Sequence, residues 1–173
     1  GPATTLIGLL QILAPLKLSA DDVIDTTDLP AGSLKTMLTS RYAQARTGLH
    51  VFVTSFSFRR GLPREADLVF DVRFLRNPHY IPALKDQTGR DAAVQAYIAE
   101  DPDFAEFEAR LRALLAPLLP RYVTEGKSYL TIAVGCTGGR HRSVYLAERL
   151  AEWLGQAGYG ISLRHRELQR ADS

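Results

Sequence analysis

Residues 128–144, SYLTIAVGCTGGRHRSV, predict a strand, a loop and a helix in direct succession. The apolar strand covers Tyr129–Val134, the glycine-rich loop covers Gly135–Gly139, and the helix begins at the largely basic turn Arg140–Ser143. The first backbone N–H groups of a helix have no acceptor within the helix, and they lie at the positive end of its dipole. This order of elements therefore predicts a binding site for phosphate or another anion.

The side chains of the same turn favour the anion site over an ordinary glycine turn, which in most proteins binds nothing. Arg142 can offer a planar pair of N–H donors to two phosphate oxygens. His141 adds a ring donor and Ser143 a hydroxyl. Several polar or cationic residues in one turn thus indicate a cradle for a phosphate or a carboxylate.

Length and composition limit the class of protein. A chain of 173 residues with 46% hydrophobic residues fits one domain, or one domain with part of another. Its apolar runs are shorter than the roughly 20 residues of a membrane helix, so no membrane partner is expected. Cys136 is the only cysteine, which excludes an internal disulfide and makes a cytoplasmic location the simplest expectation. The net charge of +2 favours no particular partner.

The chain divides into two predicted units, 1–48 and 49–173. The first holds an apolar helix-like run over Leu6–Leu18, a short strand over Asp22–Thr26 and an amphipathic helix over Ser33–Ala45. This unit is too small to bury a core alone. It is interpreted as the tail of a truncated α/β domain with a linker helix.

The second unit alternates predicted strands and helices. His50–Phe58 and Gly160–Arg166 are expected strands, and Ala66–Phe74 is a nearly continuous apolar run of the kind that suits a strand buried on both faces. Helices are predicted over Asp91–Ala99, from Pro102 with disturbance near Pro117 and Pro120, and over Arg142–Ala157. We predict an α/β fold with a small, mostly parallel sheet flanked by helices and ligand loops at the carboxyl ends of the strands.

Arginine dominates the loops at those carboxyl ends. Arginine makes two-pronged contacts to phosphate and stacks on bases, so a cluster of arginines at one edge of the sheet favours RNA binding. His79, in a proline-bracketed loop leaving the same edge, is a second candidate contact to a ligand. The predicted RNA-binding residues are Arg59, Arg60, Arg73, Arg76, Arg164, Arg166 and Arg170.

A catalytic role is the alternative that the sequence also supports. Cys136, five further residues, Arg142 and Ser143 have the spacing of the phosphate loop of cysteine-dependent phosphatases, in which a thiolate attacks phosphorus. A general acid is also needed, and Asp67, Asp71 and Asp86 are the candidates. A buried cysteine at a strand end is more often a small apolar filler. The sequence contains no Walker A motif and no paired spacing of metal ligands.

Longer motifs resemble a known family. FDVRFL (70–75), Asn77-Pro78-His79, Thr88-Gly89, GCTGGRHRSVYLAE (135–148) and Arg164-His165-Arg166 are similar to the C-terminal domain of the RNase adapter protein RapZ family. Leu13–Leu16 and Val23–Thr26 resemble the end of the N-terminal P-loop domain of that family. The resemblance therefore extends over nearly the whole chain.

The resemblance implies a bacterial regulatory adapter and not an enzyme. Its members bind small regulatory RNA and present it to an endoribonuclease, sense glucosamine-6-phosphate with the C-terminal domain, and assemble as homo-oligomers. ATP or GTP is implied only for the P-loop domain, and no cofactor or metal is expected here. The expected ligand-binding residues are His79, Cys136, Thr137, Gly138, Gly139, Arg140, His141, Arg142 and Ser143.

Overall fold

The computed structural model describes residues 48–169, so the elements expected within residues 1–47, and Arg170, lie outside the described residues. The described chain forms a four-stranded, all-parallel sheet in the order β2-β3-β1-β4. The strands are β1 (His50–Ser57), β2 (Leu68–Asp71), β3 (Tyr129–Cys136) and β4 (Gly160–His165). This is the α/β fold predicted from the sequence.

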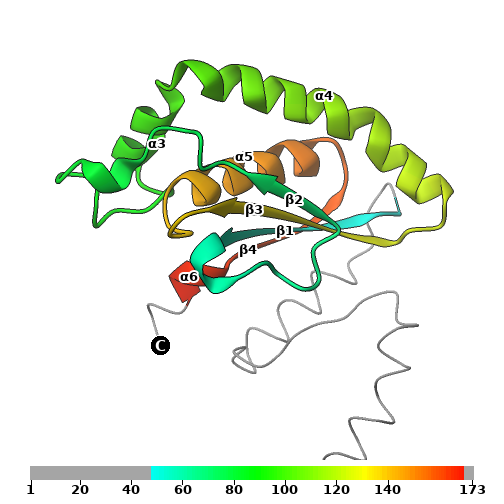
Figure 1. Ribbon diagram of the computed structural model, residues 1–173. Helices are drawn as coiled ribbons and strands as arrows, with labels where there is room; N and C mark the ends of the chain where they lie inside the picture. Colours follow the sequence, from blue (N-terminus) through cyan, green and yellow to red (C-terminus); the bar gives the residue numbers. More distant parts are fainter. Residues whose placement is uncertain (1–47, 170–173) are drawn as a thin grey trace, which may run out of the picture.

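Helices flank this sheet. They are α3 (Ala92–Ala99), α4 (Pro102–Thr124), α5 (Arg142–Gln156) and the short α6 (Arg166–Gln169), together with the 3-10 turns η1 (Phe58–Arg60) and η2 (Pro78–Tyr80). Figure 1 shows α5 against one face of the sheet, with α4 on the same side and farther out. The ring of Phe104 on α4 stacks on that of Tyr145 on α5, with ring centroids 5.1 Å apart.

The core lies between the sheet and these helices. All eight residues of β1 are buried because β1 is a central strand with β3 on one side and β4 on the other. Apolar residues of α5 at helical spacing, among them Val144, Leu150 and Leu154, are fully buried on the facing side. The sheet and α5 thus share one packed apolar core.

The expected strand over Ala66–Phe74 is wrong in length and surroundings. The observed β2 contains four residues, Leu68–Asp71, and its residues alternate between half-buried and exposed. β2 is an edge strand with β3 as its one neighbour in the described sheet, so its apolar side chains are covered less than those of a central strand.

Helix α4 runs through both prolines without interruption, although the sequence predicted a disturbance near Pro117 and Pro120. A proline within a helix removes one backbone hydrogen bond and costs about 3 kcal/mol. Leu115 and Leu119, one on each side of Pro117, are fully buried, and this packing outweighs the local preference. Among residues 48–169, no helix is long and apolar enough to cross a membrane.

Candidate anion-binding site

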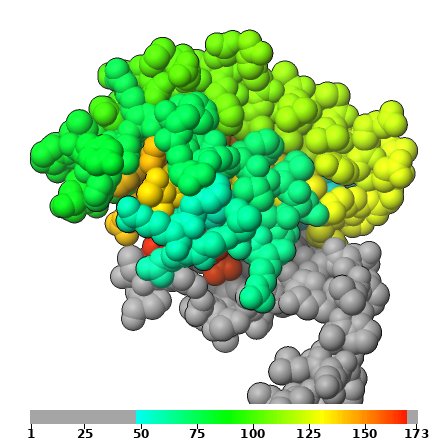
Figure 2. Space-filling view, viewed as in Figure 1, coloured from blue at the N-terminus to red at the C-terminus, as the bar shows by residue number. Residues whose placement is uncertain are grey.

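A cavity of about 470 Å³ opens at the carboxyl ends of β1 and β3. All strands are parallel, so the loops that follow them meet at this edge of the sheet. In Figure 2 the gold segment at the start of α5 lies recessed between the teal and green segments. The lining residues are Ser57, Arg59, Arg60, Asn77, His79, Tyr80, Lys85, Asp86, Cys136, Thr137, Gly138, Arg140, His141 and Arg142.

The anion loop, defined here as residues 137–141, connects the end of β3 to the start of α5. Cys136, the last residue of β3, is 2% exposed. Its Sγ accepts a hydrogen bond from the Gly139 backbone N–H (3.2 Å) and lies 3.1 Å from the Ser143 Oγ. The thiol therefore contacts both the middle of the loop, at Gly139, and the first turn of α5, at Ser143.

Arg142, the first residue of α5, is buried at the base of the cavity with 4% exposure. Its Nη1 donates to the carbonyl oxygens of Arg73 (2.6 Å) and Leu75 (2.9 Å), which follow β2. Its Nη2 is 3.4 Å from the Thr137 Oγ1. Within the described part of the chain its Nε has no hydrogen-bond partner. One side of the guanidinium is thus anchored, and the other side retains a donor for a ligand.

His141 provides a second buried nitrogen without a hydrogen-bond partner among the described residues. The residue is 7% exposed, and its Nε2 has no hydrogen-bond partner among residues 48–169. Burial lowers the pKa of His141, and the positive charges of Arg140 and His79 add to this; hydrogen bonds to the backbone of Gln87 and Lys85 oppose it. The ring is therefore neutral near pH 7 and bound to the segment on the opposite wall of the cavity.

The opposite wall comes from the segment that follows β2. The Asn77 side chain accepts a hydrogen bond from the His79 backbone N–H (3.2 Å), which shapes the turn η2. The rings of His79 and Tyr80 lie edge to face, 6.0 Å between centroids. Lys85 and Asp86 follow on the same wall. The structure therefore brings His79 to the anion loop, as expected from its position at the same sheet edge.

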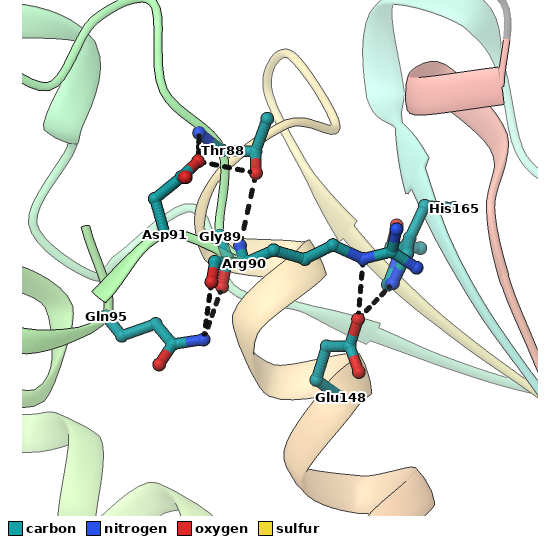
Figure 3. A network of polar contacts seen from close by, with 8 residues as sticks. Thr88, Gly89, Arg90, Asp91, Gln95, Glu148 and His165 are labelled. Atoms are coloured by element: carbon teal, nitrogen blue, oxygen red, sulfur yellow. Dashed lines mark hydrogen bonds and ion pairs between the residues drawn. The ribbon is translucent and has the colours of Figure 1, made fainter. Parts of the chain in front are cut away.

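A polar network ties the segment 88–91 to the sheet (Figure 3). The Arg90 Nε donates to the Glu148 Oε1 (2.8 Å), and the same oxygen lies 3.0 Å from the His165 Nε2. On its other side, the His165 Nδ1 lies 2.8 Å from the Ser55 Oγ. Burial lowers the pKa of His165, against the opposing effect of the Glu148 carboxylate. The network connects α5 and β4 to the segment that follows the lining residues Lys85 and Asp86.

Gly89 brings this segment directly onto the start of α5. Its backbone N–H donates to the Arg140 carbonyl oxygen at 2.8 Å. A Cβ at position 89 would lie 2.2 Å from the His141 carbonyl oxygen and 2.6 Å from the Tyr145 backbone nitrogen, so only glycine permits this approach. The segment that follows the lining residues Lys85 and Asp86 is therefore bonded directly to the anion loop.

The predicted loop residues divide into two groups. Cys136, Thr137, Gly138, Arg140, His141 and Arg142 line the cavity. Gly139 and Ser143 are buried behind it, where they shape the loop. Five lining residues were not predicted as ligand contacts: Ser57, Asn77, Tyr80, Lys85 and Asp86. The sequence features that could have indicated them are the basic loop and the proline-bracketed loop, which contain or adjoin them.

The predicted RNA-binding arginines do not all lie in equivalent surroundings. Arg59 and Arg60 line the cavity. Arg73 forms an ion pair with Asp71 (2.6 Å) and lies over the Phe58 ring (4.0 Å). Of the other predicted residues, Arg76 lies 3.9 Å from the Glu100 carboxylate, and Arg164 lies within β4. The Nη2 of Arg166 donates to the carbonyl oxygens of Ser57 and Gly61.

The three candidate acids of the phosphatase alternative are also separated. Asp67 precedes β2 at the amino end of the sheet and accepts from the Thr131 backbone N–H (2.8 Å) and Lys127 (2.9 Å). Asp71 is exposed, and its hydrogen bond from Arg73 lowers its pKa. Asp86 alone among the three lines the cavity that contains Cys136.

The parallel sheet and this loop define an α/β domain with a candidate anion site at the carboxyl edge of the sheet. The family model described as the RapZ C-terminal domain matches residues 49–169. The chain therefore belongs to the RapZ family. In agreement with the sequence resemblance, the match covers the whole described sheet and the loop that joins β3 to α5.

Several curated proteins are similar to this chain. A nucleotide-binding protein of Paramagnetospirillum magneticum is 59% identical over 163 residues, covering 94% of this chain and 53% of that protein. A nucleotide-binding protein of Rhodospirillum rubrum is 58% identical over 159 residues, covering 91% of this chain and 50% of that protein. The chain thus spans about half the length of these relatives.

Proposed function

We propose that this domain is a RapZ-like regulatory adapter that binds a phosphorylated amino sugar similar to glucosamine-6-phosphate in the cavity. It also binds RNA at the arginine-rich edge and presents small RNA to an endoribonuclease. The observation that carries the proposal is the unpartnered buried N–H donor of Arg142 Nε, in a residue that lines the cavity together with His141.

The phosphate group would occupy the anion loop. A buried N–H donor without an acceptor costs about 1–3 kcal/mol, and a phosphate oxygen at Arg142 Nε removes that cost. The backbone N–H groups at the start of α5, a helix of 15 residues, add a partial positive charge at the same place. The anchored Nη1 of Arg142 keeps the guanidinium oriented before the ligand arrives.

The amino sugar is supported by the charge distribution of the cavity. Asp86 is the sole carboxylate among the described lining residues, which otherwise include five lysines and arginines. A ligand that combines a phosphate with an ammonium group matches this arrangement, because the ammonium can approach Asp86 while the phosphate occupies the cationic end. The volume of about 470 Å³ is sufficient for a hexose phosphate.

RNA binding is supported by the exposed arginines at the mouth of the cavity. Arg59 and Arg60 are exposed, and Arg73 already lies over an aromatic ring, as arginines that contact bases often do. Arg166 is not suitable for a binding test, because its guanidinium donates to two backbone carbonyl oxygens and its replacement would also remove these structural contacts.

Calorimetric titration with glucosamine-6-phosphate tests the proposed ligand, and glucose-6-phosphate, which lacks the ammonium group, is the matched control compound.

RNA binding is tested by filter retention at about 50 and 200 mM salt, where phosphate contacts predict a steep loss of affinity. Replacement of Arg59 and Arg60 by alanine should weaken RNA binding, whereas Arg110→Ala, on the exposed face of α4, should not. Absence of ligand binding or a flat salt response would overturn the corresponding half of the proposal.

A cysteine-dependent phosphatase is the second candidate. It is favoured by the contact of the Cys136 Sγ with Ser143 and by the position of Asp86 on the same cavity. In that reaction the thiolate would attack phosphorus and Asp86 would protonate the leaving oxygen. Turnover of an aryl phosphate that disappears in Cys136→Ser would support the phosphatase; phosphosugar binding without turnover supports the adapter.

A further inference from the structure

Glu167, in the short helix α6, is a buried carboxylate next to the anion loop. Its side chain is 5% exposed, although it carries a charge. The Oε2 lies 3.2 Å from the Arg60 Nε, and the Oε1 accepts from the Arg166 Nε at 2.9 Å. The Oε1 also accepts from the Ser57 backbone N–H at 3.2 Å. One carboxylate thus joins α6 to the end of β1 and to η1.

The anion loop passes directly over the Glu167 side chain. Gly139 has a φ of +68°, and a Cβ there would lie 2.4 Å from the Glu167 Cγ and 2.8 Å from the Ser57 backbone nitrogen. The Ser57 Oγ in turn donates to the Thr137 carbonyl oxygen at 2.7 Å. Ser57 therefore contacts both the anion loop, at Thr137, and the Glu167 carboxylate.

Three of the residues connected in this way, Ser57, Arg60 and Thr137, line the cavity. Displacement of the Glu167 carboxylate would release the Arg60 side chain and the backbone at Ser57 together. Because side chains in such a packed arrangement move jointly, the position of α6 and the shape of the anion loop are linked.

We propose that Glu167 is a positioning residue that holds Arg60 and the anion loop in the geometry that binds a phosphate group. The C-terminal helix α6 and the anion site are consequently coupled, so occupation of the cavity stabilises α6. This inference rests on the proposed function, since it assumes that the cavity binds a phosphorylated ligand.

The sign of the effect separates positioning from simple electrostatics. A carboxylate near a bound phosphate repels it, so removal of the charge alone should raise the affinity for anions. If the carboxylate instead positions the site, its neutralisation should lower the affinity for anions. Glu167→Gln keeps the size of the side chain and removes the charge, and therefore distinguishes the two cases.

Glu108 provides a matched control. It is a buried carboxylate on α4 that also joins two arginines, Arg112 and Arg149, but it is not among the cavity-lining residues. Glu108→Gln therefore reproduces the loss of a buried charge away from the anion site. A comparison of the two variants separates loss of stability from loss of binding.

The experiment measures binding of inorganic phosphate and of glucosamine-6-phosphate to the wild type, Glu167→Gln, Glu167→Asp and Glu108→Gln, with a thermal melt of each. We expect Glu167→Gln to bind both at least fivefold more weakly, Glu167→Asp to retain more affinity, and Glu108→Gln to bind like the wild type. Hydrogen exchange at the amides of residues 166–169 should slow on ligand binding in the wild type and not in Glu167→Gln.

Unchanged or stronger binding by a folded Glu167→Gln would overturn the positioning role. Equal weakening by Glu108→Gln would also overturn it, because the effect would then follow general stability. If the wild type binds neither compound, the proposed function fails first and this inference fails with it.

Discussion

Arg142→Lys tests whether the guanidinium serves two purposes at once. The wild-type side chain anchors itself through Nη1 on two carbonyl oxygens, at 2.6 and 2.9 Å, and leaves its Nε for the ligand. A lysine has the same charge on one compact ammonium, which can replace the anchor or contact the phosphate but not both. Loss of one charged hydrogen bond to the ligand costs about 1.5–3 kcal/mol, so affinity should fall about 10- to 150-fold.

The measurement is a calorimetric titration with glucosamine-6-phosphate, accompanied by a thermal melt. Arg149→Lys is the control, since Arg149 pairs with the buried Glu108 of α4 and is not among the cavity-lining residues. Both variants should lose some stability, but only Arg142→Lys should lose affinity by the stated factor. An Arg142→Lys protein that binds as tightly as the wild type would show that the guanidinium fork does not hold the phosphate.

Three further predictions concern other parts of the site. Asp86→Asn should reduce the preference for glucosamine-6-phosphate over glucose-6-phosphate to near unity, as measured by competition titration; a preserved preference would exclude Asp86 as the ammonium contact. Gly139→Ala should lower the free energy of unfolding by about 2 kcal/mol or more in urea titrations, because its Cβ would lie 2.4 Å from a neighbouring side chain, whereas Gly138→Ala should be neutral since nothing lies within 4 Å. Burial lowers the pKa of His141 and His165, so the unfolded state binds more protons below about pH 6.5 and stability should fall between about pH 7.5 and 5.5, by at most about 1.4 kcal/mol per pH unit for each histidine. Constant stability across that interval would contradict the assignment of buried, neutral histidines.

The central part of the fold was predictable because its signals are local. The apolar strand before Cys136, the glycines after it and the helical spacing of α5 lie within one continuous segment, and the structure contains them in that order. The edge position of β2 was not predictable, because a run of apolar residues looks the same in an edge strand and in a central strand. The continuity of α4 through Pro117 and Pro120 likewise depends on burial of its leucines, which the local sequence does not show.

The sequence by itself determined the anion loop, since a helix start following a glycine turn exposes its own backbone donors whatever surrounds it. Tertiary structure alone decided which side chains face that loop. Lys85 and Asp86 reach it because segment 88–91 is bound to α5, and Glu167 reaches it because β4 ends beside β1. These contacts join residues that are far apart along the chain, so they follow from sheet order and packing and not from any local pattern.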